Sequence, residues 1–291
     1  MKEEEKEMSF LDHLEELRWH VIRALGAIVT CMIAAFIFTK EIFDNIILAP
    51  AKTDFLTFRA LCKLGHAVNY AEALCVDEIP MIIHSRQMTG QFTMALTSSF
   101  VIGIVVAFPY VAWEIWRFIR PGLHSNERKY SKGAVASISF LFFLGVAFGY
   151  YIMCPVSVYF LANYQISDVI QNEFDIISYV STVTTLVFGS GILFQLPVVV
   201  YFLSRVGIVT PELLKQYRKH AIVVILVIAA VITPPDPISQ TIVALPLFVL
   251  YEVSIIISAA VARSLAREEA LEEAKDRAAA AQDEETNATE E

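Results

Sequence analysis

Long runs of apolar residues, separated by polar segments, dominate this sequence. Five of the runs contain 18 or more residues, enough to cross the roughly 30 Å hydrocarbon core of a bilayer as helices. A sixth run is shorter. The runs are Val21–Phe38, Met94–Ala112, Ala134–Leu161, Ile176–Leu203, Ala221–Ile232 and Ile242–Val261. The pattern predicts an all-α, polytopic membrane protein with six transmembrane helices.

The last two runs predict a short hairpin. Residues 221–232 give about 18 Å of helix, too little for a normal bilayer without help from flanking residues or local thinning. Pro246 and Glu252 interrupt the sixth run, and Gln195 and Pro197 interrupt the fourth. We therefore expect broken helices in the second half of the chain.

Three polar segments complete the predicted organisation. Residues 1–20 are expected to form a cytoplasmic amphipathic segment, because apolar and polar side chains alternate there at helical spacing. The membrane domain covers residues 21–262 and carries an extended external loop at 40–90, expected to be a small cap with helices. Residues 263–291 form a charged cytoplasmic tail, helical at first and then acidic and disordered.

Basic residues are unevenly distributed among the short loops. Five Lys and Arg residues lie between the second and third runs and four between the fourth and fifth, whereas the short loops on the other side have none. The positive-inside rule then places both termini in the cytoplasm. The formal net charge of −9 arises mainly from residues 264–291, where ten acids and three bases give −7. The rest of the chain is therefore close to neutral, and its overall charge gives no reason to expect a nucleic-acid partner.

The chain has four cysteines, and their spacing does not suggest a metal site. Cys62 and Cys75 share the external loop, which in a bacterium faces an oxidising compartment, so we expect a disulfide between them. The alternative is a pair of buried free thiols. Cys31 and Cys154 lie within apolar runs and are expected to stay reduced.

The polar bridge Phe118–Lys129 is the best candidate recognition loop. Pro121 and the glycine after it stop the preceding helix, and Ser125-Asn126 can cap the next one. Glu127 then falls in the first helical turn, where the helix dipole favours a carboxylate, among five nearby bases. The simpler alternative is a solvated capping acid that balances local charge.

Five motifs, in order along the six runs, resemble TatC, the receptor subunit of the twin-arginine protein translocase. They are His13-Leu-Glu-Glu-Leu-Arg18, Phe118 to Arg128, Phe188-Gly189 to Gln195-Leu-Pro197, Thr233-Pro-Pro-Asp-Pro-Ile-Ser-Gln240 and Leu250-Tyr-Glu252. The resemblance covers about residues 8–262. It implies a cup-shaped protein of the bacterial cytoplasmic (inner) membrane that binds paired-arginine signal peptides of folded cargo. It also implies TatA-type and TatB-type single-span partners, self-association in the complex, and transport driven by the protonmotive force.

The resemblance also assigns roles to residues. Glu16 and Glu127 match acids linked to signal-peptide recognition, and Phe118, Pro121 and Leu123 match loop positions implicated in the same binding. Translocation-linked positions are matched by Gln195, Asp236 and Gln240. Glu252, in the middle of the sixth run, is also expected to be functional, because a charge is costly to bury there. Gln195 departs from the family, because many members have a glutamate there, so a proton-carrying role does not apply to it as it stands. The long external loop is a second departure.

Paired carboxylates suit a paired-arginine ligand. A guanidinium keeps its proton and presents a planar fork that a carboxylate accepts through two hydrogen bonds. Several positions also have simpler alternatives: an internal ion pair for Glu252, an interhelical hydrogen bond for Gln195, and a turn terminator for Asp236.

Two other classes of function stay open at this stage. Broken spans with polar residues near the midplane would suit a secondary transporter for a small solute. A purely structural scaffold is the third possibility. The transporter is the weaker alternative, because no inverted repeat is evident and the sharpest polar features lie on cytoplasmic loops. The sequence shows no nucleophile–base pair and no phosphate-binding loop, so we expect neither an enzyme nor a cofactor.

Overall fold

The computed structural model describes residues 10–67, 75–76, 78–119, 131–167, 169, 172–233 and 237–290. The chain divides into two compact units, which are described separately. The first contains Met1–Phe194 and Ala230–Val243, and the second contains Gln195–Ala229 and Ala244–Glu291.

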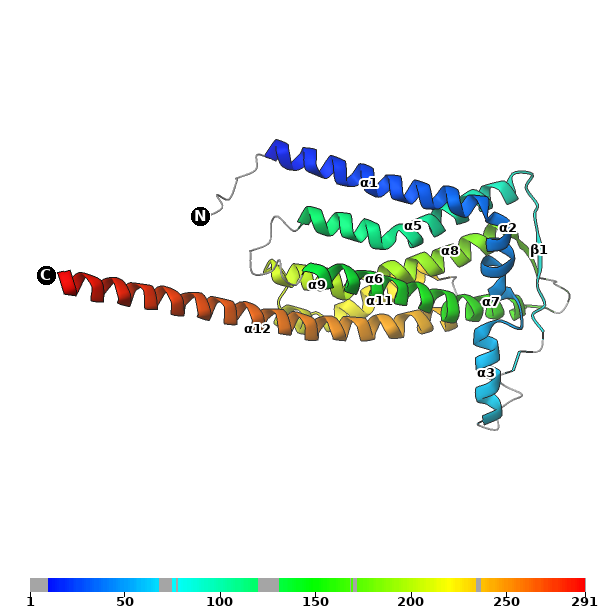
Figure 1. Cartoon of the computed structure of the whole chain (residues 1–291). Helices are drawn as coiled ribbons and strands as arrows, with labels where there is room; N and C mark the ends of the chain where they lie inside the picture. The colour runs from blue at the N-terminus through cyan, green and yellow to red at the C-terminus, as the bar shows by residue number, and fades with distance from the viewer. Residues whose placement is uncertain are drawn as a thin grey trace. The chain divides into compact units, whose positions relative to one another are not determined.

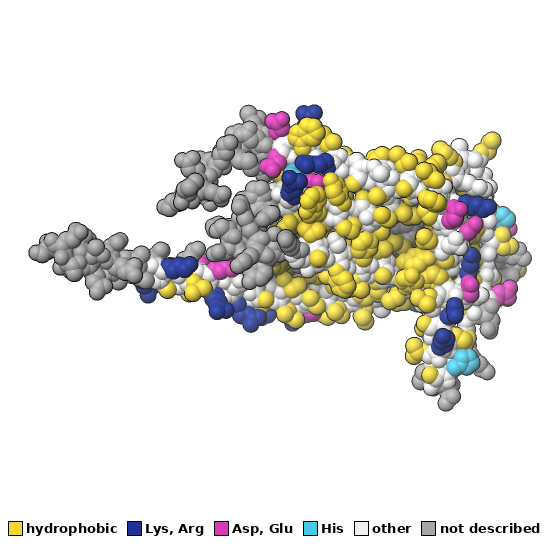
Figure 2. Space-filling view, in the orientation of Figure 1, with side chains coloured by type: hydrophobic (Ala, Val, Ile, Leu, Met, Phe, Trp, Pro, Cys, Tyr) yellow, Lys and Arg dark blue, Asp and Glu magenta, His cyan; other side chains and the backbone are white. Residues whose placement is uncertain are grey.

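The first unit is built from long helices that lie side by side. Helices α1 (Phe10–Ile37) and α5 (Gly90–Ile119) run in opposite directions, so the start of α1 meets the end of α5 (Figure 1). Gly103 permits their close approach, since a Cβ there would lie 2.8 Å from the Met32 backbone nitrogen. Figure 2 shows hydrophobic side chains over the visible face of these helices, with charged side chains toward their ends.

A second helix pair completes the core of this unit. Helix α6 (Ser131–Phe148) continues through the π-helical turn Gly149–Met153 into α7 (Cys154–Asn163), and α6 packs against α8 (Ile176–Leu193). Small residues line this contact. The Ser190 hydroxyl donates to the Gly145 carbonyl oxygen at 2.8 Å, a bond that only closely packed backbones allow.

A cap of short elements covers one end of the first unit. It comprises α2 (Thr39–Ile42), the π-helical turn Phe43–Ile47, the 3₁₀ turn Ala49–Ala51 and α3 (Leu56–Ala67). The structure contains a disulfide between Cys62 and Cys75, the pair that the sequence favoured. Cys31 and Cys154 are free thiols. Two tyrosine hydroxyls anchor the cap to the long helices, Tyr150 on the Ile46 carbonyl and Tyr179 on the Ile47 carbonyl.

Two short strands were not predicted. β1 (Ile82–His84) pairs in parallel with β2 (Glu173–Asp175), and Arg86 Nη2 lies 3.0 Å from Glu173 Oε2 beside them. Asp175 also caps α8 by accepting from the Ile177 N–H at 2.8 Å. The three-residue strands are too short to leave an alternating pattern in the sequence.

The second unit contains α9 (Leu196–Arg205), α10 (Pro211–Gln216) and most of α11 (Arg218–Ile232) and α12 (Pro237–Glu290). Its helices are joined by polar contacts, including a 2.8 Å bond between the hydroxyls of Ser204 and Ser258. Tyr251 donates to the Leu214 carbonyl oxygen at 2.7 Å.

Among the described residues, five helices are long and apolar enough to cross a membrane: Glu15–Ile37, Gly90–Ile119, Gly133–Asn163, Ile176–Arg205 and Gln240–Lys275. These confirm an all-α membrane protein with several spans. The predicted fifth span is helical as α11, but its 15 residues extend only about 22 Å. It is therefore a short helix, as the sequence indicated.

The C-terminal tail differs from the prediction. Instead of losing structure after its first turns, it continues α12 as helix to Glu290. Alanine, glutamate, lysine and arginine dominate this part, and all favour helix. Pairs one turn apart add to this preference, such as Arg277 with Glu273 at 3.4 Å.

Candidate functional site

A buried polar cluster lies where the start of α1 meets the end of α5. His20 on α1 is 4% exposed and Glu114 on α5 is 1% exposed. The His20 Nδ1 atom and Glu114 Oε2 form a short contact across 94 residues of sequence. An ionised carboxylate can only accept hydrogen bonds, so His20 Nδ1 carries the hydrogen of this pair.

The second Glu114 oxygen is also occupied. Tyr110, one turn earlier on α5, donates its hydroxyl to Glu114 Oε1 at 2.9 Å. The Arg23 Nε atom lies 3.9 Å from the same oxygen and donates to the Trp19 carbonyl at 3.1 Å. A carboxylate within an apolar helix bundle is costly unless it is paired and hydrogen-bonded. Glu114 meets both conditions.

Two of the predicted recognition residues border this cluster. Glu16 lies one turn before His20 on α1, with its Oε1 3.9 Å from His20 Nε2 and its side chain 39% exposed. Phe118, near the end of α5, places its ring edge-on to the imidazole with centroids 6.1 Å apart. The structure thus brings Glu16 and Phe118 together on His20. The predicted partners Pro121, Leu123 and Glu127 lie outside the described residues.

The translocation-linked positions lie elsewhere in the chain. Gln195 is the half-buried residue at the break between α8 and α9, where its carbonyl accepts from the N–H groups of Val198 and Val199. Pro197 lies in the first turn of α9, a position that proline favours because its missing N–H and fixed φ suit a helix start. Gln240 is half-buried near the start of α12, and Asp236 is outside the described residues.

Glu252 is internally paired. Its Oε2 lies 2.7 Å from Arg218 Nη2 at the first residue of α11. Arg218 is 14 residues before the end of α11, and Glu252 is 15 residues after the start of α12, so the two residues lie at about the same distance from the neighbouring ends of the two helices. This pairing agrees with the alternative role considered for Glu252.

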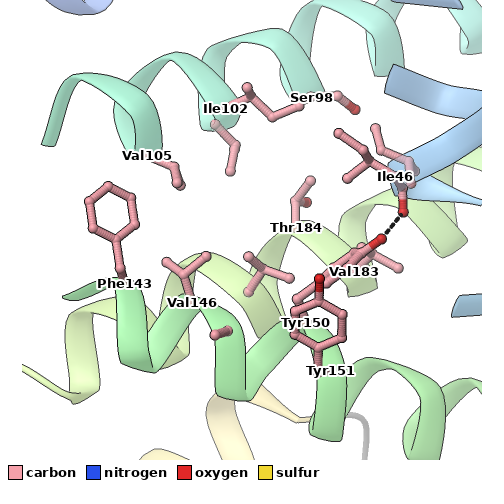
Figure 3. A pocket seen from close by; sticks show the side chains of 14 residues that line it. Ile46, Ser98, Ile102, Val105, Phe143, Val146, Tyr150, Tyr151, Val183 and Thr184 are labelled. Carbon is pink, nitrogen blue, oxygen red and sulfur yellow. Dashed lines mark hydrogen bonds between the residues drawn. The ribbon is translucent and has the colours of Figure 1, made fainter. Parts of the chain in front are cut away.

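An apolar cavity of about 390 Å³ lies within the first unit, between α5, α6 and α8 (Figure 3). Its lining is aliphatic and aromatic apart from a few hydroxyl groups. The Tyr150 hydroxyl already donates a hydrogen bond to the Ile46 carbonyl oxygen. The Ser98 hydroxyl is buried without a hydrogen-bond partner among the described residues. A polar solute would find too few partners here, which weighs against a solute-binding site.

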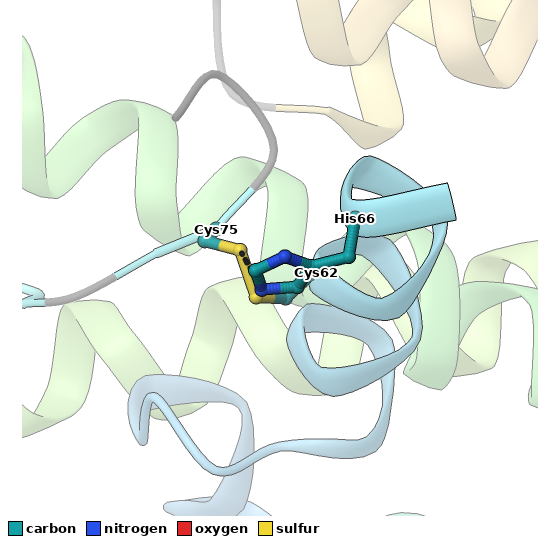
Figure 4. A group of neighbouring side chains, drawn as sticks. All are labelled: Cys62, His66 and Cys75. Atoms are coloured by element: carbon teal, nitrogen blue, oxygen red, sulfur yellow. Dashed lines mark hydrogen bonds between the residues drawn. A yellow bond between two sulfur atoms is a disulfide. The ribbon is translucent and has the colours of Figure 1, made fainter. Parts of the chain in front are cut away.

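His66 lies beside the Cys62–Cys75 disulfide, and its Nε2 is 3.9 Å from Cys75 Sγ (Figure 4). This spacing resembles a metal site because the three side chains each offer a ligand atom within 4.8 Å of the others. Metal ligation requires thiolates, however, and both sulfur atoms are used in the disulfide. The group therefore acts as a structural link of the cap while the bond is intact.

His20 and Glu114 were not predicted as site residues from the sequence. His20 lies in the predicted amphipathic segment, and Glu114 lies between two tryptophans at the end of a span. One signal was available, because both residues flank the membrane on the same predicted side. A glutamate within the last turns of an apolar helix requires a partner.

The chain matches one protein family over most of its length. The family model described as Sec-independent protein translocase protein (TatC) matches residues 12–246. TatC of Blattabacterium sp. subsp. Periplaneta americana is 40% identical over 259 residues, covering 89% of this chain and 97% of that protein. TatC of Helicobacter pylori strain J99 is 36% identical over 246 residues, covering 84% and 87%.

Solved structures agree with these relatives. A crystal structure of the twin arginine translocase receptor TatC covers 86% of this chain and 99% of its own, with a TM-score of 0.64 and 29% identity. A second, in DDM, covers 84% and 99%, with a TM-score of 0.68 and 30% identity. The chain belongs to the TatC family, whose members are components of the Sec-independent protein translocase.

Proposed function

We propose that this protein is the receptor subunit that binds paired-arginine signal peptides at the α1–α5 end of the first unit. The observation that carries the proposal is the convergence of Glu16 and Phe118 on His20. Glu16 and Phe118 are about a hundred positions apart in sequence, and each belongs to a motif that the resemblance links to signal recognition. Two related solved structures are described as receptors of the twin-arginine translocase.

The chemistry of the site suits such a ligand. Glu16 is partly exposed, so an incoming guanidinium can reach its carboxylate, while Phe118 offers an apolar ring against the same imidazole. Glu127 supplies the second acid. Each charged hydrogen-bonded contact contributes roughly 1.5–3 kcal/mol, less at an exposed interface. Apolar contact with the hydrophobic segment of the signal supplies the remaining affinity, which leaves binding reversible.

The resemblance and the loop charges support the remaining functional assignments that we propose. TatA-type and TatB-type single-span subunits and further copies of this chain assemble with the receptor, and the protonmotive force drives the translocation step. Gln195, Asp236 and Gln240 act in that step or in partner binding. The location is the bacterial cytoplasmic membrane, with both termini in the cytoplasm.

We predict that Glu16→Gln and Glu127→Gln each weaken binding of a paired-arginine signal peptide about tenfold, because each removes one charged acceptor. The double variant is expected to lose little more than either single variant, since both acids act on one ligand. Binding of arginine-pair and lysine-pair peptides to the full chain in nanodiscs measures this. Unchanged discrimination between the two peptides in the double variant would show that selectivity resides elsewhere.

We also predict that the loop at Asn126 faces the cytoplasm and the loop at Ile166 faces outside. The bases are segregated on the Asn126 side, and the disulfide-containing cap suits an oxidising compartment. The test introduces Asn126→Cys or Ile166→Cys into a variant lacking Cys31 and Cys154, and adds an impermeant thiol reagent to intact cells. Only the cysteine at 166 is expected to react. Labelling at position 126 alone would show that the topology is the opposite of the one predicted.

A further inference from the structure

We propose that His20 is a positioning residue for signal recognition, held in place by Glu114 and in turn setting the Glu16 carboxylate and the Phe118 ring. This inference rests on the proposed function, because it concerns how the same site is ordered. It assigns the buried cluster beneath Glu16 a role in specificity beyond the stability of the α1–α5 contact.

The imidazole of His20 is fixed from one side. Its Nδ1–H is directed at Glu114, whose carboxylate is fixed by the Tyr110 hydroxyl at 2.9 Å and is 1% exposed. Hydrogen bonding at one ring nitrogen determines the ring orientation and the direction of the other nitrogen. The Nε2 atom of His20 consequently has one defined direction.

That direction leads to the recognition residues. His20 Nε2 lies 3.9 Å from Glu16 Oε1, and the ring contacts Phe118 edge-on. Glu16 has a flexible side chain, and a carboxylate that accepts both hydrogen bonds of a guanidinium must direct both of its oxygens toward that group. A fixed neighbour reduces the conformational freedom that is lost when the ligand binds.

The charges in the cluster leave Glu16 available. The nearby cation Arg23 lies 3.9 Å from Glu114 Oε1, where it balances the buried carboxylate. Without Glu114, Arg23 could turn toward Glu16 and compete with the arginines of the ligand. Glu114 thus orients His20 and also occupies Arg23. This arrangement predicts a selective loss of arginine recognition when the cluster is altered.

The experiment measures binding of arginine-pair and lysine-pair signal peptides to the full chain in nanodiscs, for His20→Ala, Glu114→Ala and Glu114→Gln. Both alanine variants are expected to bind the arginine-pair peptide about tenfold more weakly and the lysine-pair peptide almost unchanged. Glu114→Gln is expected to lose about threefold, because its amide can still accept from His20 and donate to Tyr110 but, being uncharged, no longer pairs with Arg23. Val21→Ala, exposed on the same helix, is the matched control.

The same variants in a Glu16→Gln background separate positioning from a structural role. If His20 acts through Glu16, His20→Ala causes no further loss there. An equal loss in both backgrounds, or unaltered binding by His20→Ala, would overturn the inference. If the alanine variants fail to fold, Tyr110→Phe decides, with an expected loss of about threefold that requires Glu16. An unaltered chain without arginine preference would instead refute the proposed function.

Discussion

Replacing Gly145 with alanine is expected to lower the thermal stability of the protein, whereas the same change at Gly133, on the same helix, is expected to raise it slightly. A Cβ at 145 would lie 2.6 Å from the Ser190 carbonyl oxygen and 2.8 Å from Phe194 Cβ, closer than van der Waals contact allows. A Cβ at 133 would meet nothing within 4 Å. Overpacking costs about 1–3 kcal/mol, while alanine in a helix gains up to about 1 kcal/mol over glycine.

The two variants are expected to shift the unfolding midpoint in opposite directions, so each serves as a control for the other. Both variants add one methyl group to α6, so differences in helix propensity cannot explain a divergence. Thermal unfolding of the purified protein in detergent, followed by circular dichroism, gives the two midpoints under one set of conditions. Midpoints that shift together would show that α6 and α8 separate easily at Gly145 and that this contact does not hold the first unit together.

Local patterns in the sequence were sufficient to predict most of the long helices. The apolar runs predicted the long helices because the bilayer selects helices by length and hydrophobicity, which are sequence properties. The break at Gln195 was predicted because Pro197 lacks an N–H and disfavours a helix interior, although α5 and α12 accommodate Pro109 and Pro246. The short fifth helix was predicted from the length of 221–232 alone. The break expected in the sixth run at Pro246 and Glu252 is wrong, because α12 continues through both residues.

Long-range pairing could not be predicted in the same way. The bond between His20 and Glu114 depends on how α1 and α5 are rotated about their axes, which small residues such as Gly103 determine. The parallel pairing of β1 with β2 joins segments separated by three long helices. The role of Glu16 and Phe118 came from motif resemblance, and their shared contact with His20 came only from the structure.

Breaking the Arg218–Glu252 pair is expected to destabilise the second unit unequally from its two sides. The two side chains meet at 2.7 Å between α11 and α12. Arg218→Gln leaves the Glu252 carboxylate, whose side chain is 33% exposed, without a partner and on the shorter side chain of the two. Glu252→Gln leaves an arginine whose long side chain can extend to the interface. The first variant is therefore expected to lose about 1 kcal/mol and the second clearly less.

The swapped double variant, Arg218→Glu with Glu252→Arg, tests whether the interaction itself matters. A glutamate at the first residue of α11 is favoured by the helix dipole, and an arginine at 252 can span the same gap. The swap is expected to recover more than half of the stability lost by Arg218→Gln. Unfolding midpoints of all three variants, measured in one detergent, provide the comparison. A swapped variant no more stable than Arg218→Gln would show that the position of each charge, and not their pairing, stabilises the short α11–α12 hairpin.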